Sequence, residues 1–167
     1  IMLFKRMNNL SVIIALLSMG LITSCGYTMR GSLNLPASLS DISVYSSKYS
    51  VLVNSINETL INSGMNVTNS NDKTMHRIVI LSERFNRRQL SMSISGRVNE
   101  YELIYDVQYE INLPNEKNLS DSITLYRDYS FDENNVMGNS DREDDIKTEM
   151  ISTASTLIFN KLRAYAK

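Results

Sequence analysis

Residues 101–113 read YELIYDVQYEINL and alternate between apolar and polar side chains over their whole length. The odd positions, from Tyr101 to Leu113, are all aliphatic or aromatic, and Ile104 is the only apolar residue at an even position. Successive side chains of a strand point to opposite faces of a sheet. This period of two therefore predicts a strand with one buried face and one wet face, in a sheet that is covered on one side.

The segment that follows predicts a neighbouring strand. Residues 123–131 repeat the alternation, and the polar residues 115–118 predict a turn between the two runs. Two alternating runs joined by a short turn are typical of an antiparallel pair.

The segments that precede residues 101–113 predict two more strands. Residues 76–90 (HRIVILSERFNRRQL) begin with strand-forming residues and end in a basic segment, and Ser95-Gly96-Arg97 predicts a hairpin tip after them. Residues 41–46 (DISVYS) predict a first strand, whereas the polar residues 66–73 are interpreted as a turn.

Two segments have the apolar spacing of helices. Residues 48–63 predict one helix, with Ser46 or Ser47 as its N-cap and Gly64 as its C-terminal stop. Ser140 and Glu143 have the spacing of a capping box and predict the start of a second helix. The inward stripe of this second helix is expected to be Ile146, Met150, Ala154, Leu157, Ile158 and Leu162.

Together these segments predict an α+β fold in the order strand, helix, three strands, helix (β-α-β-β-β-α). Two helices that cover one face of a four-stranded, mostly antiparallel sheet would bury both apolar stripes. Residues 41–167 are expected to form this single domain.

The beginning of the chain has the pattern of an export signal. Lys5 and Arg6 precede an apolar run, and Ile22-Thr23-Ser24-Cys25 has the aliphatic, small, small, cysteine order of a lipoprotein lipobox. We expect residues 1–24 to be a lipoprotein signal peptide, Cys25 to carry the lipid, and residues 25–40 to lead to the domain. A short transmembrane anchor is the alternative, but the run is shorter than the roughly 20 apolar residues of a typical span.

Composition and motifs argue against several functions. The formal net charge of −1 gives no general reason to expect nucleic-acid binding. His76 is the only histidine, and the sequence has neither a phosphate-binding glycine loop nor a Gly-x-Ser-x-Gly elbow. A row of carboxylates on the even positions of the central strand is interpreted as a solvated face: Glu100, Glu102, Asp106 and Glu110. An enzyme or a metal site is therefore not expected.

Four arginines form the candidate ligand site. Arg84, Arg87, Arg88 and Arg97 lie near the ends of two strands that we expect to be joined, so they could converge at one tip. The planar guanidinium suits phosphate groups, such as those of the outer-membrane glycolipid. The alternative is that these charges keep an edge strand soluble.

Several short segments follow one another in a defined order along the chain. Residues 25–31 read CGYTMRG, with Pro36 a few residues on, and residues 96–101 (GRVNEY) lead into the alternating strand. Arg127 lies between Tyr126 and Tyr129, and residues 143–145 are acidic. With these segments the chain as a whole resembles the LptE family of outer-membrane lipoproteins: the first is similar to the opening of that family, the second resembles its central hairpin, and the others fit the same pattern.

The resemblance implies a function and a location. An LptE-like protein would plug an LptD-type β-barrel, help that barrel to assemble, and support delivery of lipopolysaccharide to the outer leaflet. It would lie on the periplasmic side of the outer membrane of a Gram-negative bacterium, held by a diacylglycerol and an N-acyl chain on Cys25, with no other cofactor. Lipopolysaccharide contact would fall to Arg84, Arg87, Arg88 and Arg97. The alternative is a membrane-tethered periplasmic carrier of glycolipids without a barrel partner; a tethered hydrolase is disfavoured because no nucleophile and base are evident.

Overall fold

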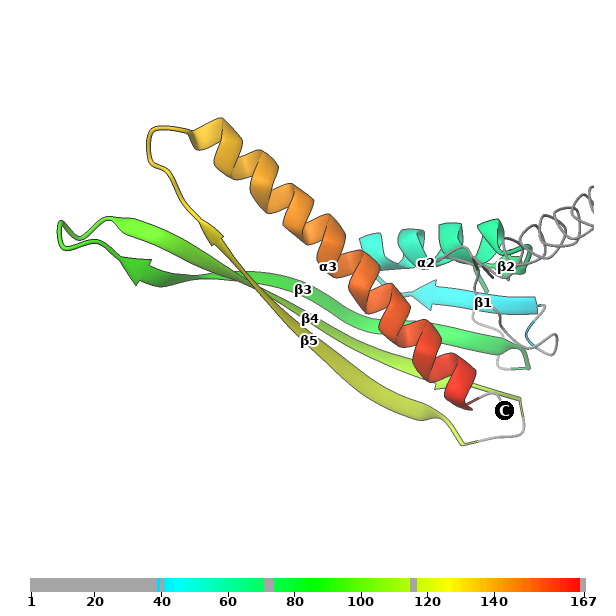
Figure 1. The fold of residues 1–167 in the computed structure, drawn as a ribbon. Coiled ribbons are helices and arrows are strands. Elements are labelled where there is room, and N and C mark those ends of the chain that lie inside the picture. The colour runs from blue at the N-terminus through cyan, green and yellow to red at the C-terminus, as the bar shows by residue number, and fades with distance from the viewer. Residues whose placement is uncertain (1–38, 40, 71–73, 115–116, 166–167) are drawn as a thin grey trace, which may run out of the picture. The chain divides into compact units, whose positions relative to one another are not determined.

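The computed structural model describes residues 39, 41–70, 74–114 and 117–165. The predicted signal peptide, Cys25 and nearly all of the predicted lead lie outside the described residues. The described domain is a sheet with two helices, drawn in Figure 1. Its strands are β1 (Asp41–Ser46), β2 (Asn66–Thr68), β3 (His76–Met92), β4 (Val98–Asn112) and β5 (Leu119–Ser130).

The sheet is mixed and has the strand order β2-β1-β3-β4-β5. β1 is parallel to both β2 and β3, whereas β3, β4 and β5 are antiparallel neighbours. The α+β class is therefore confirmed, but the predicted count of four strands is wrong by one. The additional strand is β2, which was interpreted as part of a turn. Three residues with a single half-buried side chain, Val67, are too few to show an alternation.

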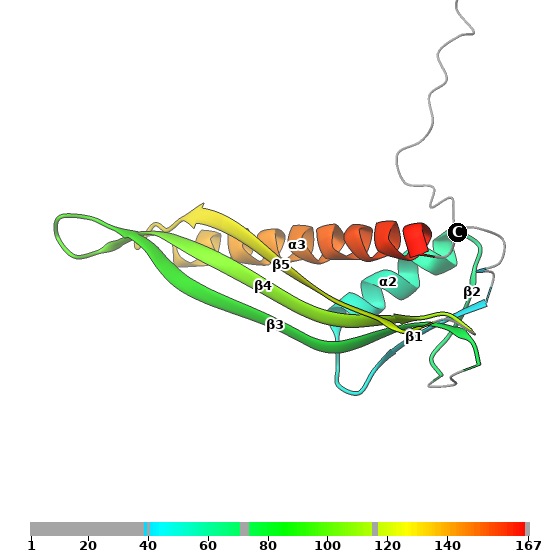
Figure 2. The same cartoon turned by 90° about the horizontal axis from the view of Figure 1, so that it is seen from below.

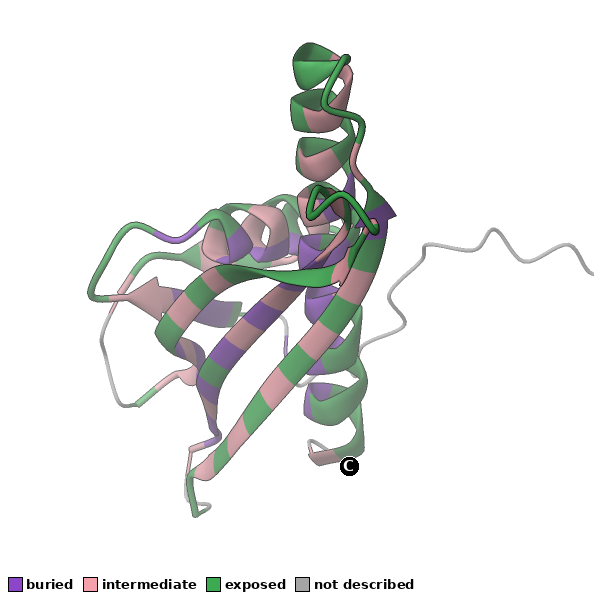
Figure 3. Ribbon diagram, turned by 90° about the vertical axis from the view of Figure 1, so that its left-hand side faces the viewer, coloured by how far each residue is buried: buried purple, intermediate pink, exposed green. Residues whose placement is uncertain are grey.

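The predicted alternation of β4 is confirmed. Leu103, Tyr105, Val107, Tyr109 and Ile111 are all at most 2% exposed and lie on one face. In Figure 3 the buried residues run along the middle of the sheet, while β5 at its edge alternates between half-buried and exposed positions. The predicted antiparallel pair of β4 and β5 is also confirmed, from Glu100 opposite Ser130 to Ile111 opposite Leu119.

Both helices cover the same face of the sheet, as Figure 2 shows. They are α2 (Val51–Asn62) and α3 (Val136–Tyr165). Their buried side chains join those of the sheet in one core, and the hydroxyls of Ser55 and Ser155 lie 3.2 Å apart where the helices meet. The predicted placement of two helices on one face is confirmed.

The start of α2 differs from the prediction. Its N-cap is Ser50, whose hydroxyl accepts a hydrogen bond from the Val53 N–H at 3.1 Å, not Ser46 or Ser47. The prediction of Gly64 as the stop is confirmed. Gly64 has a φ of +80°, and the Met65 N–H donates to the Leu60 carbonyl at 3.1 Å, as in a Schellman motif.

The start of α3 also differs. The helix begins at Val136, so Ser140 lies inside it and the predicted capping box is wrong. The Asn135 side chain instead accepts a hydrogen bond from the Gly138 N–H at 3.0 Å. The predicted stripe holds except at Leu157, which is 42% exposed, and Ile151 and Phe159 are buried in addition.

The Ser50 cap gives a stability test. We expect Ser50→Ala to lower the free energy of unfolding by about 1 kcal/mol, because the Val53 N–H loses its acceptor. Ser47→Ala is the matched control, since Ser47 is exposed and lies outside α2. Urea unfolding of the full chain measures both variants, and an equal effect of the two substitutions would contradict the cap assignment.

Candidate functional site

The strand register separates the arginines that were predicted to converge. Arg84 lies opposite Asp106 and Arg88 opposite Glu102, both on the open face of the sheet. Arg87 pairs in register with Leu103 and therefore points to the helix-covered face. Arg97 lies at the β3–β4 hairpin tip, next to Gly96, whose φ is +79°. The four residues are thus distributed over two faces and a tip.

Each of the four arginines has a carboxylate partner within the chain. Arg84 lies 3.7 Å from Asp106, Arg87 2.9 Å from Glu143, Arg88 2.5 Å from Glu102, and Arg97 3.3 Å from Glu133. A phosphate would therefore have to compete with a carboxylate for each guanidinium. The competition is easiest at Arg84 and Arg97, where the side chains are 70% exposed and the pairs are longest.

Arg87 belongs to a network that connects the β3–β4 hairpin, β5 and α3. Its partner Glu143 also accepts hydrogen bonds from the Tyr129 hydroxyl at 2.6 Å and from Lys147 at 2.8 Å. The guanidinium lies 4.6 Å from the centre of the Tyr101 ring, within the range of a cation–π contact. These contacts fasten the beginning of α3 to the sheet.

The network changes the acidity of Glu143. Burial raises the pKa of this carboxyl, but hydrogen bonds from Lys147, Tyr129 and Arg87 outweigh burial and lower the pKa to about 2. Burial and the hydrogen bond to Glu143 raise the pKa of the Tyr129 hydroxyl. Glu143 is consequently ionised at neutral pH, and its role here is structural.

The open face of the sheet carries polar side chains that are hydrogen-bonded to one another. The Ser91 hydroxyl donates to Glu100 at 2.6 Å, Thr124 donates to Asp106 at 2.9 Å, and Ser120 donates to Glu110 at 3.1 Å. In the carboxylate row, Glu102 and Asp106 are paired with arginines, whereas Glu100 and Glu110 accept hydrogen bonds from hydroxyls. The prediction of a solvated face is wrong for Glu102, which is only 8% exposed. Within the part of the chain that the structure describes, no group of three or more potential metal ligands occurs.

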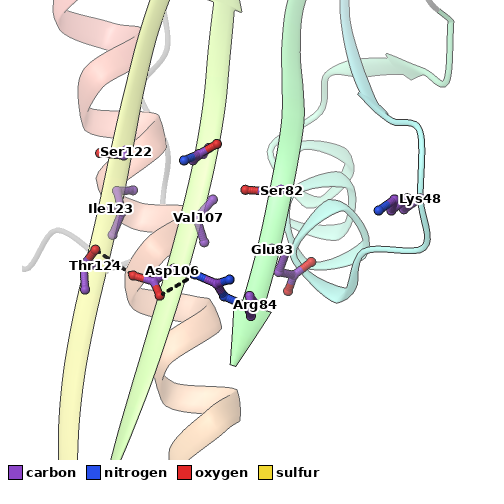
Figure 4. Close-up of a pocket in the computed structure, with 10 residues that line it drawn as sticks. Lys48, Ser82, Glu83, Arg84, Asp106, Val107, Ser122, Ile123 and Thr124 are labelled. Carbon is purple, nitrogen blue, oxygen red and sulfur yellow. Dashed lines mark hydrogen bonds and ion pairs between the residues drawn. The ribbon is translucent and has the colours of Figure 1, made fainter. Parts of the chain in front are cut away.

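A hollow of about 580 Å³ lies on this face, near the irregularity in β3 between Ile80 and Ser82. Figure 4 shows its residues, with Asp106 linked both to Arg84 and to Thr124. Lys48 and Glu83 add further charges to the lining. A lining of this kind suits polar groups and offers little to an acyl chain.

Glu83 is a structural residue that the sequence analysis missed. Its carboxylate accepts hydrogen bonds from the Tyr105 hydroxyl at 2.8 Å and from the Leu52 N–H at 3.3 Å, at the start of α2. Burial, together with Glu83, raises the pKa of Tyr105. The sequence signal for Glu83 is its spacing of two residues from Phe85, which places a charged residue on the same face of the strand as an aromatic one. In the structure Phe85 stacks on Tyr105, with ring centres 4.1 Å apart.

Comparison with known sequences decides the family. The LptE (Lipopolysaccharide-assembly) sequence profile matches residues 39–162. The chain belongs to the LptE family. As an LptE-family protein it is a lipopolysaccharide-assembly lipoprotein, a non-enzymatic class, which confirms the resemblance seen in the sequence.

Proteins similar to the chain include a curated LptE protein and several solved structures. The LPS-assembly lipoprotein LptE of Pectobacterium atrosepticum is 24% identical over 140 residues, which are 83% of this chain and 76% of that protein. The crystal structure of rare lipoprotein B from Shewanella oneidensis has a TM-score of 0.68 at 24% identity and covers 75% of this chain and 96% of its own. The solution structure of lipoprotein B from Nitrosomonas europaea has a TM-score of 0.69 at 23% identity and covers 84% of this chain and 92% of its own. The crystal structure of the minor lipoprotein from Acinetobacter baumannii has a TM-score of 0.59 at 19% identity and covers 77% of this chain and 93% of its own.

The three solved structures show that the fold is shared.

In the described part of this LptE-family chain, neither helix is long and apolar enough to cross a membrane.

Glu143 gives a prediction with a defined pH dependence. Because its pKa falls from an ordinary 4.5 to about 2 on folding, the stabilisation is complete above pH 5 and is lost as the pH falls toward 2. We expect Glu143→Gln to lower the free energy of unfolding at pH 7 by roughly 2 kcal/mol, the scale of hydrogen bonds to a charged group. Urea unfolding between pH 7 and pH 2.5 should show the difference from the unaltered protein shrinking.

Asp144→Asn is the control for this experiment. Asp144 also lies near Lys147, at 3.4 Å, but its side chain is 71% exposed, so we expect a change below about 0.5 kcal/mol. A pH-independent effect of Glu143→Gln would contradict the proposed ionic role of the network.

Proposed function

We propose that this LptE-family lipoprotein plugs the lumen of an LptD-type outer-membrane β-barrel. In that position it would help the barrel to assemble and support delivery of lipopolysaccharide to the outer leaflet. The observation that carries the proposal is the family match, which extends over residues 39–162 and so includes nearly the whole described domain. The Pectobacterium relative is itself named an LPS-assembly lipoprotein.

The open face of the sheet supports the plug proposal. It carries hydroxyls and charges of both signs, tied together by pairs such as Arg88 with Glu102 and Thr124 with Asp106. The interior of large outer-membrane barrels is polar, so a surface of this type can exchange hydrogen bonds with the barrel wall without burying unpaired charge.

The proposed location rests on the sequence of the predicted lipobox. Cys25, which lies outside the described residues, would carry the diacylglycerol and N-acyl chains that hold the protein on the periplasmic side of the outer membrane. More than one acyl chain is needed for stable anchoring, and this modification would supply them. Cys25→Ala is therefore expected to mislocalise the protein, which cell fractionation would measure.

The plug proposal is tested by co-purification. The protein is tagged at its C-terminus and extracted with detergent, and its bound partners are identified by mass spectrometry. We expect a stoichiometric complex with one large outer-membrane β-barrel protein. Recovery of the lipidated protein alone would overturn the plug role and favour the tethered glycolipid carrier.

Binding of lipopolysaccharide by Arg84, Arg87, Arg88 and Arg97 stays a prediction, and the ion pairs indicate how to test it. Arg84→Gln combined with Arg97→Gln should weaken binding by roughly tenfold, because two exposed guanidinium groups are lost without disturbing the core. Binding to purified lipopolysaccharide at two salt concentrations measures the effect.

Arg163→Gln is the matched control for the ligand test. Arg163 is an exposed arginine in the last turn of α3 and pairs with Asn160 at 3.0 Å. We expect its loss to leave binding unchanged. Equal binding by all variants would exclude Arg84 and Arg97 as ligand contacts while leaving the plug role intact.

A further inference from the structure

The two edges of the sheet are very different. β2, at one edge, is only three residues long, and short edge strands are one way in which proteins avoid unwanted pairing. β5, at the other edge, is a run of 12 residues (LSDSITLYRDYS) with no proline and no lysine. Its register with β4 continues without a bulge from Leu119 to Ser130. The β5 edge therefore lacks the shortness, the bulges, the proline and the lysine that often protect an edge strand, and its charges are limited to Asp121, Arg127 and Asp128.

The hydrogen bonds of β5 identify which residues face the open edge. Just past the end of β5, the Phe131 N–H donates to the Asn99 carbonyl at 2.7 Å, so this odd position points toward the β4 side. At even positions, the Ser122 N–H donates to the Asp121 side chain at 2.8 Å, and the Tyr126 carbonyl accepts from Arg127 at 2.9 Å. Peptide groups alternate in direction along an antiparallel strand, so the even residues present their N–H and C=O groups outward.

The sequence of this edge is complementary to itself. When residues 121–127 (DSITLYR) are set antiparallel to a second copy about Thr124, Asp121 lies opposite Arg127 of the second copy. Ser122 then lies opposite Tyr126, and Thr124 lies opposite Thr124. The Ser122 N–H and the Tyr126 carbonyl, which the chain covers with its own side chains, are hydrogen-bonding partners in this register.

The helix-covered side of the same edge is apolar. Ile123 and Leu125 are half-buried there, and Leu157 of α3 is 42% exposed beside Ile123. In the antiparallel arrangement Ile123 lies opposite Leu125 of the second copy. Opposite charges and apolar side chains placed directly across from one another both stabilise antiparallel pairs.

We propose that the free protein forms a twofold dimer through antiparallel pairing of its β5 strands, centred on Thr124. The two five-stranded sheets then form one continuous sheet of ten strands. An interface of this kind is isologous, because the same residues contribute from both copies. The proposal concerns the protein when it is not bound to a barrel, so its test is independent of the plug proposal.

The first test is disulfide cross-linking of the full chain carrying Thr124→Cys. Hydrogen-bonded residues directly opposite each other in an antiparallel pair have Cα atoms about 5.5 Å apart, within the range that a disulfide bridges. We expect oxidation of the purified protein to give a covalent dimer on a non-reducing gel. The unaltered chain, which contains Cys25, measures the background.

Ser120→Cys is the matched control. Like Thr124, Ser120 lies on the open face of β5, and its hydroxyl also donates to a β4 carboxylate, that of Glu110. In the proposed register Ser120 lies opposite Asp128, so the two copies of residue 120 are about 27 Å apart. Equal cross-linking of both variants, or a monomer in both cases, would overturn the proposal.

Charge reversal provides a second test that does not depend on cysteine. Arg127→Asp places two carboxylates opposite each other at each end of the pair, and we expect sedimentation to show loss of the dimer. Arg127 also pairs with Glu149 of its own chain at 3.4 Å, so circular dichroism must show that the variant remains folded. Sedimentation of the unaltered protein as a monomer, or retention of the dimer by folded Arg127→Asp, would contradict the register.

Discussion

Burial of one face of β4 is the constraint on which the rest of the domain depends. β4 has a neighbour on each side, and its odd-numbered side chains join the buried side chains of both helices in a single core. The two large residues of this row, Tyr105 and Tyr109, fill the layer between sheet and helices. Because their hydroxyls are polar, each needs a partner, and Glu83 and Asp121 supply them. Packing of the central strand thus determines the positions of these two carboxylates on the neighbouring strands β3 and β5.

The charges of the domain act mainly on one another. Arg87 and Glu143 connect the sheet to α3, while Arg88 and Glu102 hold β3 against β4 on the other face. Glu102 is only 8% exposed, and a carboxylate this far from water requires its partner. A sheet whose charges are matched in this way presents a surface without a dominant sign. Recognition by such a surface depends on the positions of its hydrogen bonds more than on long-range attraction.

The regular part of the fold could be predicted from the sequence because its signals are periodic. The alternation in β4 and β5 and the helical spacing of Leu52, Ile56 and Leu60 were sufficient for the α+β class. The helix starts could not be placed, because several serines and asparagines offered equivalent caps and the choice of Ser50 and Asn135 depends on tertiary position. The arginine site could not be assembled either. Which face Arg87 or Arg88 occupies follows from a strand register that includes irregularities, and a shift of one residue exchanges the faces.

The parallel pairing of β1 with β3 has a consequence for the order in which the domain folds. β3, β4 and β5 follow one another along the chain and can close as two successive hairpins, whereas Ile42 meets His76 only after α2 and β2 have been passed. Contacts between distant residues require a larger loss of chain entropy and form more slowly than local ones. The segment nearest the N-terminus is therefore expected to join last, onto a meander that already exists. In a chain synthesised from its N-terminus, this first strand would have only β2 as a neighbour until β3, and the meander that β3 begins, has followed it.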